Sequence, residues 1–162
     1  MNITDNFCSS VDFYNLNKFC NSQLNWETKT STTDNKSDNV LNYRYCVYER
    51  GEPLDKNCWD IFNPILKLLS ARAILRIAIN KVPRIKKSFI TDWHTDFPYK
   101  DSKTSIIYMN TNNGYTILKT KNEDKKVNSI ENRCLTFSSN TLHAVQLHTD
   151  IDERIVINLN YF

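Results

Sequence analysis

A succession of short segments rich in Ile, Val, Thr and Tyr fills the chain from residue 72 to residue 162. Pro, Asn, Asp and Gly residues separate these segments, and such residues favour turns between strands. The expected strands cover residues 72–79, 84–93, 103–110, 115–120, 126–130, 133–138, 142–148 and 153–161. The dipeptide Asn113-Gly114 suits a tight hairpin turn. Short strands at this spacing predict an all-β sandwich or barrel.

Two helices are expected before the all-β body. Ser9 or Ser10 is suited to cap a helix that runs to about Asn21. Apolar residues recur at helical spacing over residues 55–70, where Pro64 is expected to restart or kink the helix.

The two expected helices are joined by a loop and a strand. Residues 27–39 contain no aliphatic or aromatic side chain and predict an exposed loop, whereas residues 40–48 alternate as a strand does. With 162 residues the chain is long enough for one domain. We therefore interpret residues 1–162 as a single domain, with 1–70 as a support region containing one strand and 71–162 as the core.

Composition excludes several classes of protein. Only two glycines occur, so neither a P-loop nor a G-x-G-x-x-G dinucleotide turn is present. The net charge of +3 is small, which makes a nucleic-acid partner the weaker expectation. Five cysteines form no C-x-x-C pair, and their odd number favours reduced thiols in the cytoplasm. No apolar run approaches the ~20 residues of a membrane span, and no secretory signal is recognisable.

The stretch DWHTDFPYK places His94 and Asp96 two residues apart. On a strand, both side chains would point to one side, so that they could bind a metal ion together. Two histidines are candidates for a third ligand, and we choose His143 because it shares a face with Val145, whereas His148 lies at odd spacing. A solvated strand end is the competing interpretation of an isolated H-x-D pair.

The last expected strand, DERIVINLNYF, has one apolar and one polar face. Its polar face carries Arg154, Asn158 and Asn160 beside Val156. A solvent-facing side would explain this pattern, but the same residues suit a polar pocket in which an arginine binds a carboxylate through two hydrogen bonds. The hydroxyl group of Tyr108 is a candidate second donor to that carboxylate.

Four motifs in order, WHTD, SIIYMN, NRCLTFSSNTLHAVQ and ERIVINLNYF, resemble the Fe(II)- and 2-oxoglutarate-dependent oxygenases. The likeness is to the prolyl-hydroxylase-like branch, including small uncharacterised members encoded by phages, and it covers residues 72–162. It implies a double-stranded β-helix core of the jelly-roll, cupin-like type. For a phage protein, the cytoplasm would be that of the host.

The resemblance also implies a role for each site residue. The iron ligands, which are the catalytic centre, would be His94, Asp96 and His143. The distal carboxylate of 2-oxoglutarate would bind Arg154 and Tyr108. The resemblance places Asn158 and Asn160 along the co-substrate pocket and Val145 beside the metal. We further expect Trp93 and Phe97 to pack away from the metal, and the loop 98–103 to form the rim that selects the substrate.

The implied activity is that of a dioxygenase. Fe(II), 2-oxoglutarate and O2, with ascorbate in support, would hydroxylate a C–H bond and release succinate and CO2. The implied substrate is a prolyl residue of a peptide or protein. The alternatives are an oxygenase acting on nucleic acid, a nucleotide or a small metabolite, and a catalytically silent binding or structural module.

Overall fold

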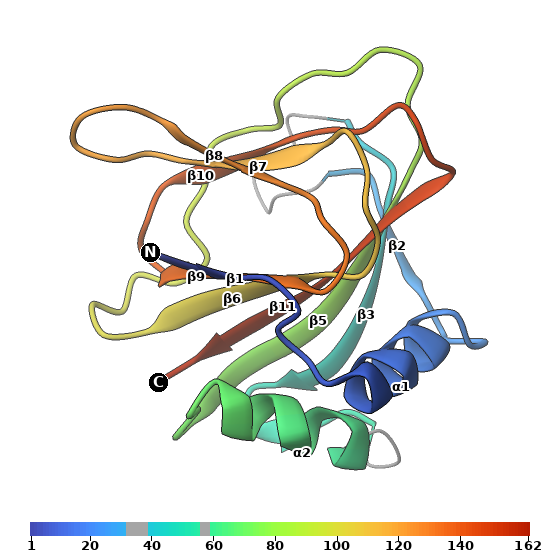
Figure 1. Cartoon of the computed structure of the whole chain (residues 1–162), viewed down its shortest axis with the longest axis vertical. Coiled ribbons are helices and arrows are strands. Elements are labelled where there is room, and N and C mark those ends of the chain that lie inside the picture. The colour runs from blue at the N-terminus through green and yellow to red at the C-terminus, as the bar shows by residue number, and fades with distance from the viewer. Residues whose placement is uncertain (32–38, 56–58) are drawn as a thin grey trace.

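The computed structural model describes residues 1–31, 39–55 and 59–162. A large and a small β-sheet lie above one another, and the two helices cover the side of the large sheet that faces away from the small one (Figure 1). The predicted fold class, mainly β with N-terminal helices, is confirmed. Among the described residues, no helix has the length and apolar character needed to cross a membrane.

The strands of both sheets pair antiparallel. The large sheet has the order β1 (Asn2–Thr4), β9 (Arg133–Ser138), β6 (Lys103–Tyr108), β11 (Glu153–Tyr161), β5 (Ile74–Pro83), β3 (Asn42–Glu49) and β2 (Glu27–Lys29), with β4 (Glu52–Pro53) paired to β3. The small sheet has the order β10 (His143–Gln146), β7 (Tyr115–Leu118) and β8 (Lys125–Asn128).

Strand β11 shows how the large sheet uses its two faces. Ile157 and Leu159 belong to the main hydrophobic core, which also contains Leu16 and Phe62 of the helices. Val156 points the other way, into a second apolar cluster with residues of the small sheet. Side chains alternate across a strand, so the face that carries Arg154, Asn158 and Asn160 lines the space between the sheets.

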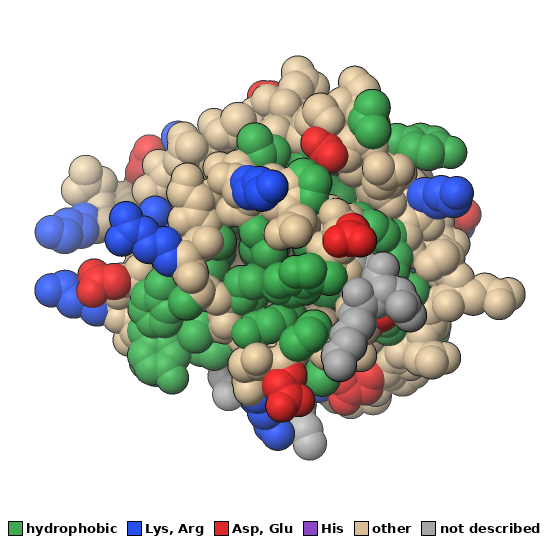
Figure 2. All heavy atoms as spheres, turned by 90° about the horizontal axis from the view of Figure 1, so that it is seen from below, with side chains coloured by type: hydrophobic (Ala, Val, Ile, Leu, Met, Phe, Trp, Pro, Cys, Tyr) green, Lys and Arg blue, Asp and Glu red, His purple; other side chains and the backbone are tan. Residues whose placement is uncertain are grey.

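Both helices form where the sequence predicts them. Helix α1 spans Ser10–Cys20, and the Ser9 hydroxyl caps it by accepting a hydrogen bond from the Asp12 amide at 3.2 Å. Helix α2 spans Trp59–Leu68 and contains Pro64 within it; of the predicted span 55–70, residues 56–58 lie outside the described part of the chain. Figure 2, a view from below Figure 1, shows apolar side chains gathered in the middle of the helical side of the molecule.

The first 70 residues contribute more strand than predicted. Within the described part of this region, four strands occur where one was expected, because β1, β2 and β4 are too short to show a sequence period. Strand β2 lies in the stretch predicted as a loop, and its pairing with β3 supplies the strand geometry that the exposed side chains of β2 do not predict. Residues 32–38 of that predicted loop lie outside the described part.

The strand predicted at residues 84–93 is wrong. This segment runs beside β10 but pairs with it only at isolated bridges, Ile90 with Gln146 and His94 with His143. One reason is that a side chain takes the place of a backbone carbonyl as acceptor: the Val145 amide donates to the Thr91 hydroxyl at 3.0 Å. Regular pairing is thereby interrupted just before the H-x-D pair.

The hairpin predicted at Asn113-Gly114 is also wrong. Strands β6 and β7 flank this dipeptide but belong to different sheets. The glycine is instead required by close approach, since a Cβ atom on Gly114 would lie 2.8 Å from the Gln146 carbonyl oxygen and 2.9 Å from Asn112 Oδ1. Positive φ therefore plays no part at this position.

Candidate metal and co-substrate site

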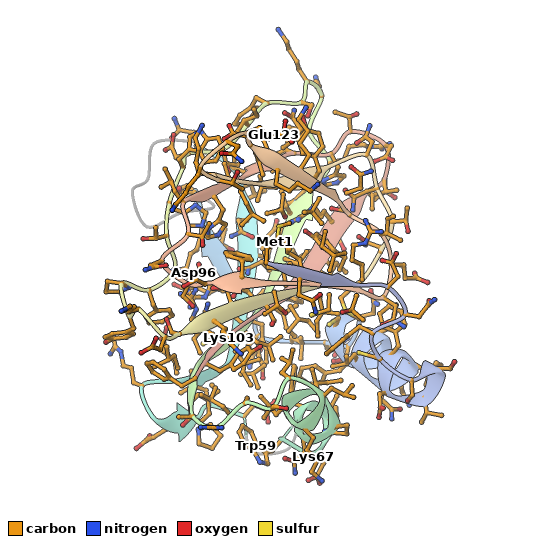
Figure 3. All side chains as sticks on the ribbon, turned by 60° about the vertical axis from the view of Figure 1, so that its left-hand side comes forward. Met1, Trp59, Lys67, Asp96, Lys103 and Glu123 are labelled. Carbon is orange, nitrogen blue, oxygen red and sulfur yellow. The ribbon has the colours of Figure 1, made fainter. Side chains whose placement is uncertain are left out.

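Two segments that are distant in the sequence bring three possible metal ligands together. The backbones of His94 and His143 exchange both hydrogen bonds of an antiparallel bridge, at 2.9 and 2.8 Å. The Asp96 amide then donates to the Ser139 carbonyl at 3.0 Å, which turns the chain toward the large sheet. As a result, one ligand atom each of His94, Asp96 and His143 lies within 4.8 Å of the others. In Figure 3, Asp96 lies apart from Trp59 and Lys67, which mark helix α2.

Both imidazole rings are oriented by backbone carbonyl groups. His94 Nδ1 lies 3.2 Å from the Asp92 carbonyl oxygen, and His143 Nδ1 lies 3.0 Å from that of Thr141. A carbonyl oxygen only accepts, so each Nδ1 carries a proton, and in the neutral imidazole Nε2 then keeps the lone pair. This is the tautomer in which a histidine binds a metal through Nε2.

The Asp96 carboxylate is oriented by its second oxygen. Oδ2 accepts hydrogen bonds from Thr104 Oγ1 at 2.7 Å, Asn160 Nδ2 at 3.0 Å and Asn158 Nδ2 at 3.5 Å. Oδ1 lies 4.0 Å from His143 Nε2 and 3.5 Å from a nitrogen of Arg76. Oδ1 is thus the oxygen that faces the histidines, and the arrangement favours a single Asp96 oxygen as ligand.

The directions in which the pKa values of Asp96 and His143 are shifted suit a metal ion. Burial opposes ionisation of Asp96, but His143, Arg76 and the Thr104 hydrogen bond outweigh it and hold the Asp96 pKa below its usual value. Burial and the neighbouring His94 ring lower the pKa of His143. A carboxylate beside neutral imidazoles is the form in which all three residues coordinate.

A narrow cavity of about 70 Å³ extends from the two histidines toward Arg154. Its walls are largely apolar and include Val82, Ile106, Val145, Leu147 and Val156. Arg154 is only 4% exposed, and its Nε donates to Ser129 Oγ at 3.3 Å. The slot thus combines apolar walls, a buried cation and two of the candidate metal ligands. This lining matches a short dicarboxylate whose methylene groups lie between the sheets and whose one carboxylate lies at the guanidinium.

A wider cavity of about 480 Å³ adjoins the triad at His94 and Asp96. It shares Asn42, Asn80, His94 and Asn158 with the narrow cavity. Most of its other lining residues are polar or charged. They come from strands β2, β3 and β5, from residues 93–96, and from the positions after β2 and before β10: Lys29, Ser31, Arg44, Arg76, Ala78, Trp93, Thr95, Asp96 and Leu142. The triad therefore borders two spaces of different chemistry.

Two residues of the predicted co-substrate pocket make other contacts. The Tyr108 hydroxyl donates to Thr116 Oγ1 at 2.8 Å, and it is the face of the ring that meets Arg154, whose Cζ lies 5.6 Å from the centroid. The Asn160 amide bonds Asp96, and neither Tyr108 nor Asn160 lines the narrow cavity. Arg154, Asn158 and Val145 do line it.

The predicted surroundings of the H-x-D pair need correction. Trp93 was expected to point away from the metal, but it lines the wider cavity beside His94, because the segment is not a regular strand. The loop 98–103 was expected at the rim. It does not line the wider cavity, and Tyr99 instead packs on Phe162, with ring centroids 5.9 Å apart.

Sequence reasoning missed Arg76 and Thr104, which hold Asp96. The signal for Arg76 was present: Arg76, Ala78 and Asn80 alternate with the apolar Ile77 and Ile79 on β5, as polar and apolar residues do on β11. The same parity argument that assigned the polar face of β11 would have placed Arg76 between the sheets.

The fold and these side chains define a class: a double-stranded β-helix with a His-Asp-His group between its sheets. No protein-family model matches the sequence, and no curated protein matches it in a sequence search. Solved structures do match the fold. A 2OG-Fe(II) oxygenase family protein from Burkholderia pseudomallei has a TM-score of 0.69 at 12% identity, over 98% of this chain and 82% of that one.

Two further matches have informative ligands. A prolyl hydroxylase from Trichoplax adhaerens, solved with a hypoxia inducible factor peptide fragment, has a TM-score of 0.70 at 19% identity, over 99% of this chain and 82% of that one. The epimerase SnoN of nogalamycin biosynthesis, solved with Fe3+, alpha ketoglutarate and nogalamycin RO, has a TM-score of 0.67 at 10% identity, over 98% and 77%. The predicted jelly-roll core is thus confirmed as the fold of 2OG-Fe(II) oxygenases.

Proposed function

We propose that this chain is an Fe(II)- and 2-oxoglutarate-dependent dioxygenase that hydroxylates a C–H bond. The observation that carries the proposal is the pairing of a complete His94, Asp96 and His143 group with a slot whose lining also contains Arg154. Two imidazoles and one carboxylate that leave open positions are the ligand set of non-haem Fe(II) oxygenases. When bound there, iron and 2-oxoglutarate supply oxygen activation with release of succinate and CO2.

The chain's own residues contribute binding, orientation and shielding. Arg154 would bind the distal carboxylate of 2-oxoglutarate, and Val145 and Val156 would exclude water from its methylene groups. The Tyr108 ring stacks near the Arg154 guanidinium and keeps it in place, so we assign Tyr108 an indirect role in co-substrate binding. Asn158 lies where both cavities meet and would contact either ligand.

The wider cavity is the proposed site of the molecule that is hydroxylated. Hydroxylation of a prolyl residue stays a prediction, supported by the fold shared with a peptide-binding prolyl hydroxylase. A catalytically silent module is the weaker proposal, because all three candidate ligands are present and oriented.

The cellular location is proposed from the cysteines. The buried Cys8, Cys20 and Cys134, which form no disulfide, fit the reducing cytoplasm that we propose as the location. The phage-like origin also stays a prediction.

Oxygen-dependent turnover of 2-oxoglutarate tests the proposal. Purified protein with Fe(II), ascorbate and 2-oxoglutarate is expected to form succinate slowly, and faster with its substrate. His94→Ala should abolish this, whereas Lys18→Gln on the exposed surface of α1 should not. Wild-type protein that binds metal and forms no succinate, in the presence or absence of candidate substrates, would favour the silent module.

A further inference from the structure

The lining of the wider cavity contains three cations, Lys29, Arg44 and Arg76, and one carboxylate among the described residues, Asp96. Glu27 and Glu49 pair with Lys29 and Arg44 but do not line the cavity themselves. Asp96 Oδ1 faces the histidines, so the negative charge of Asp96 acts mainly on the candidate metal site. A cavity with this balance attracts an anion.

Arg44 is the cation best placed for a ligand. It lies opposite Asn80 of β5, and its side chain is 14% exposed. A register shift between Cys46 and Tyr48 places Glu49 within 3.2 Å of one Arg44 nitrogen. Because the Glu49 side chain is 38% exposed, its ion pair holds Arg44 in position but contributes little to the free energy of folding. A guanidinium carries five N–H donors, and one carboxylate does not use them all.

The other two cations extend the same surface. Arg76 contacts Asp96 and donates from Nε to Asn160 Oδ1 at 3.1 Å, so it lies deep in the cavity beside the metal ligands. Lys29 pairs at 3.3 Å with Glu27, whose side chain is 64% exposed. An incoming anion would therefore meet positive charge from the mouth of the cavity to the triad.

Two buried amide oxygens in the lining lack a hydrogen-bond donor that a ligand could supply. Asn42 Oδ1 and Asn158 Oδ1 have no hydrogen-bond partner among the described residues. Asn158 Nδ2 is directed at Asp96, which turns its Oδ1 away from the carboxylate. Buried acceptors without partners cost about 1–3 kcal/mol each, a cost that a hydroxyl or amine group of a ligand would remove.

We infer, on the basis of the proposed function, that the primary substrate is a small anion bearing hydroxyl or amine groups. Its carboxylate or phosphate binds Arg44, which lines the wider cavity and not the narrow one, and its donors bind Asn42 and Asn158. The cavity volume of about 480 Å³ suits a small molecule. An uncharged prolyl ring matches this wall poorly, because Ala78, Trp93 and Leu142 are the only apolar side chains among the described residues that line it.

The test is anion binding to protein that already holds Mn(II) and 2-oxoglutarate. Inorganic phosphate and acetate are the two probes, and they distinguish a phosphate from a carboxylate site. Broadening of the phosphorus signal by Mn(II) reports phosphate near the triad, and calorimetry reports acetate. We expect at least one probe to bind the wild type, and Arg44→Gln to weaken it about tenfold or more.

Matched variants separate this site from the co-substrate site. Arg44→Lys should recover part of the binding, and Glu49→Gln should strengthen it, because it removes the competing carboxylate. Arg44→Gln should leave 2-oxoglutarate binding unchanged. Arg154→Gln should bind 2-oxoglutarate far more weakly and, titrated with Mn(II) alone, should keep the anion. Lys18→Gln is the control for loss of one surface charge, and thermal melting checks that each variant folds.

Three outcomes would overturn the inference. The first is 2-oxoglutarate binding without binding of either probe, which leaves the proposed function intact. The second is probe binding that Arg44→Gln does not change, the behaviour of an adventitious ion only. The third is tight, salt-sensitive binding of a single-stranded oligonucleotide without binding of either probe, which would favour a nucleic-acid substrate. Failure of 2-oxoglutarate itself to bind would instead contradict the proposed function.

Discussion

The Asn160 amide donates a hydrogen bond to Asp96 Oδ2 at 3.0 Å and, together with Thr104 and Asn158, leaves Oδ1 to face the histidines. Asn160 is fully buried on β11, and it also donates to Thr104 Oγ1 at 2.9 Å. A side chain expected in the co-substrate pocket thus acts as a support for a metal ligand.

Asn160→Ala should weaken metal binding and destabilise the fold. The substitution removes one hydrogen bond from Asp96 and leaves partners of Asn160 buried, which costs about 1–3 kcal/mol in unfolding free energy. Loss of such a supporting group lowers metal affinity about 10- to 100-fold. Calorimetric titration with Mn(II) and urea unfolding measure the two effects. Asn122→Ala, in the exposed β7–β8 loop, is the control, and equal metal affinity in both variants would contradict the assigned role.

Buried thiols predict a loss of stability at alkaline pH. Burial raises the pKa of Cys20 from 9.0 to about 12. The folded state therefore keeps this proton while the unfolded state loses it, so the stabilisation is complete below pH 9 and declines as the pH rises toward 12. Cys20→Ala should show a shallower decline of unfolding free energy between pH 8 and 10, by up to about 1.4 kcal/mol per pH unit above 9. Parallel curves for the two proteins would argue against it.

The two glycines should differ in their tolerance of alanine. Gly114→Ala places a methyl group against backbone oxygen, a clash that costs about 1–3 kcal/mol. Gly51 has open space but a φ of +88°, so Gly51→Ala incurs backbone strain of about 1 kcal/mol. Urea unfolding of the two variants is expected to rank Gly114→Ala as the less stable, and the reverse order would show that the β10 backbone yields to the new methyl group.

Sequence periodicity predicted the two-faced strands well. On β11 the alternation of apolar and polar residues correctly separates Ile157 from Asn158, because one face packs on helices and the other lines the cavities. The same alternation on β5 places Arg76 on the face that lines the wider cavity.

The parts that periodicity did not predict depend on contacts between distant segments. Strands β1 and β2 exist because β9 and β3 offer edges to pair with, which no local pattern records. Thr91 interrupts pairing through its hydroxyl, so the strand predicted at 84–93 is lost although its composition favours one. Resemblance brought Asn160 to the correct region, but only packing reveals that its amide bonds Asp96 rather than the co-substrate.

An oxygenase of the proposed kind binds 2-oxoglutarate only when its metal site is loaded. Calorimetric titration without oxygen, in the presence of Mn(II), is predicted to give one site per chain in the wild type. The same titration should give no binding in His94→Ala, and binding weakened at least about 100-fold in Arg154→Gln, which loses a charged hydrogen-bonding partner in a buried slot. Wild-type protein that binds Mn(II) but not 2-oxoglutarate, or Arg154→Gln that binds it as tightly as wild type, would contradict the account.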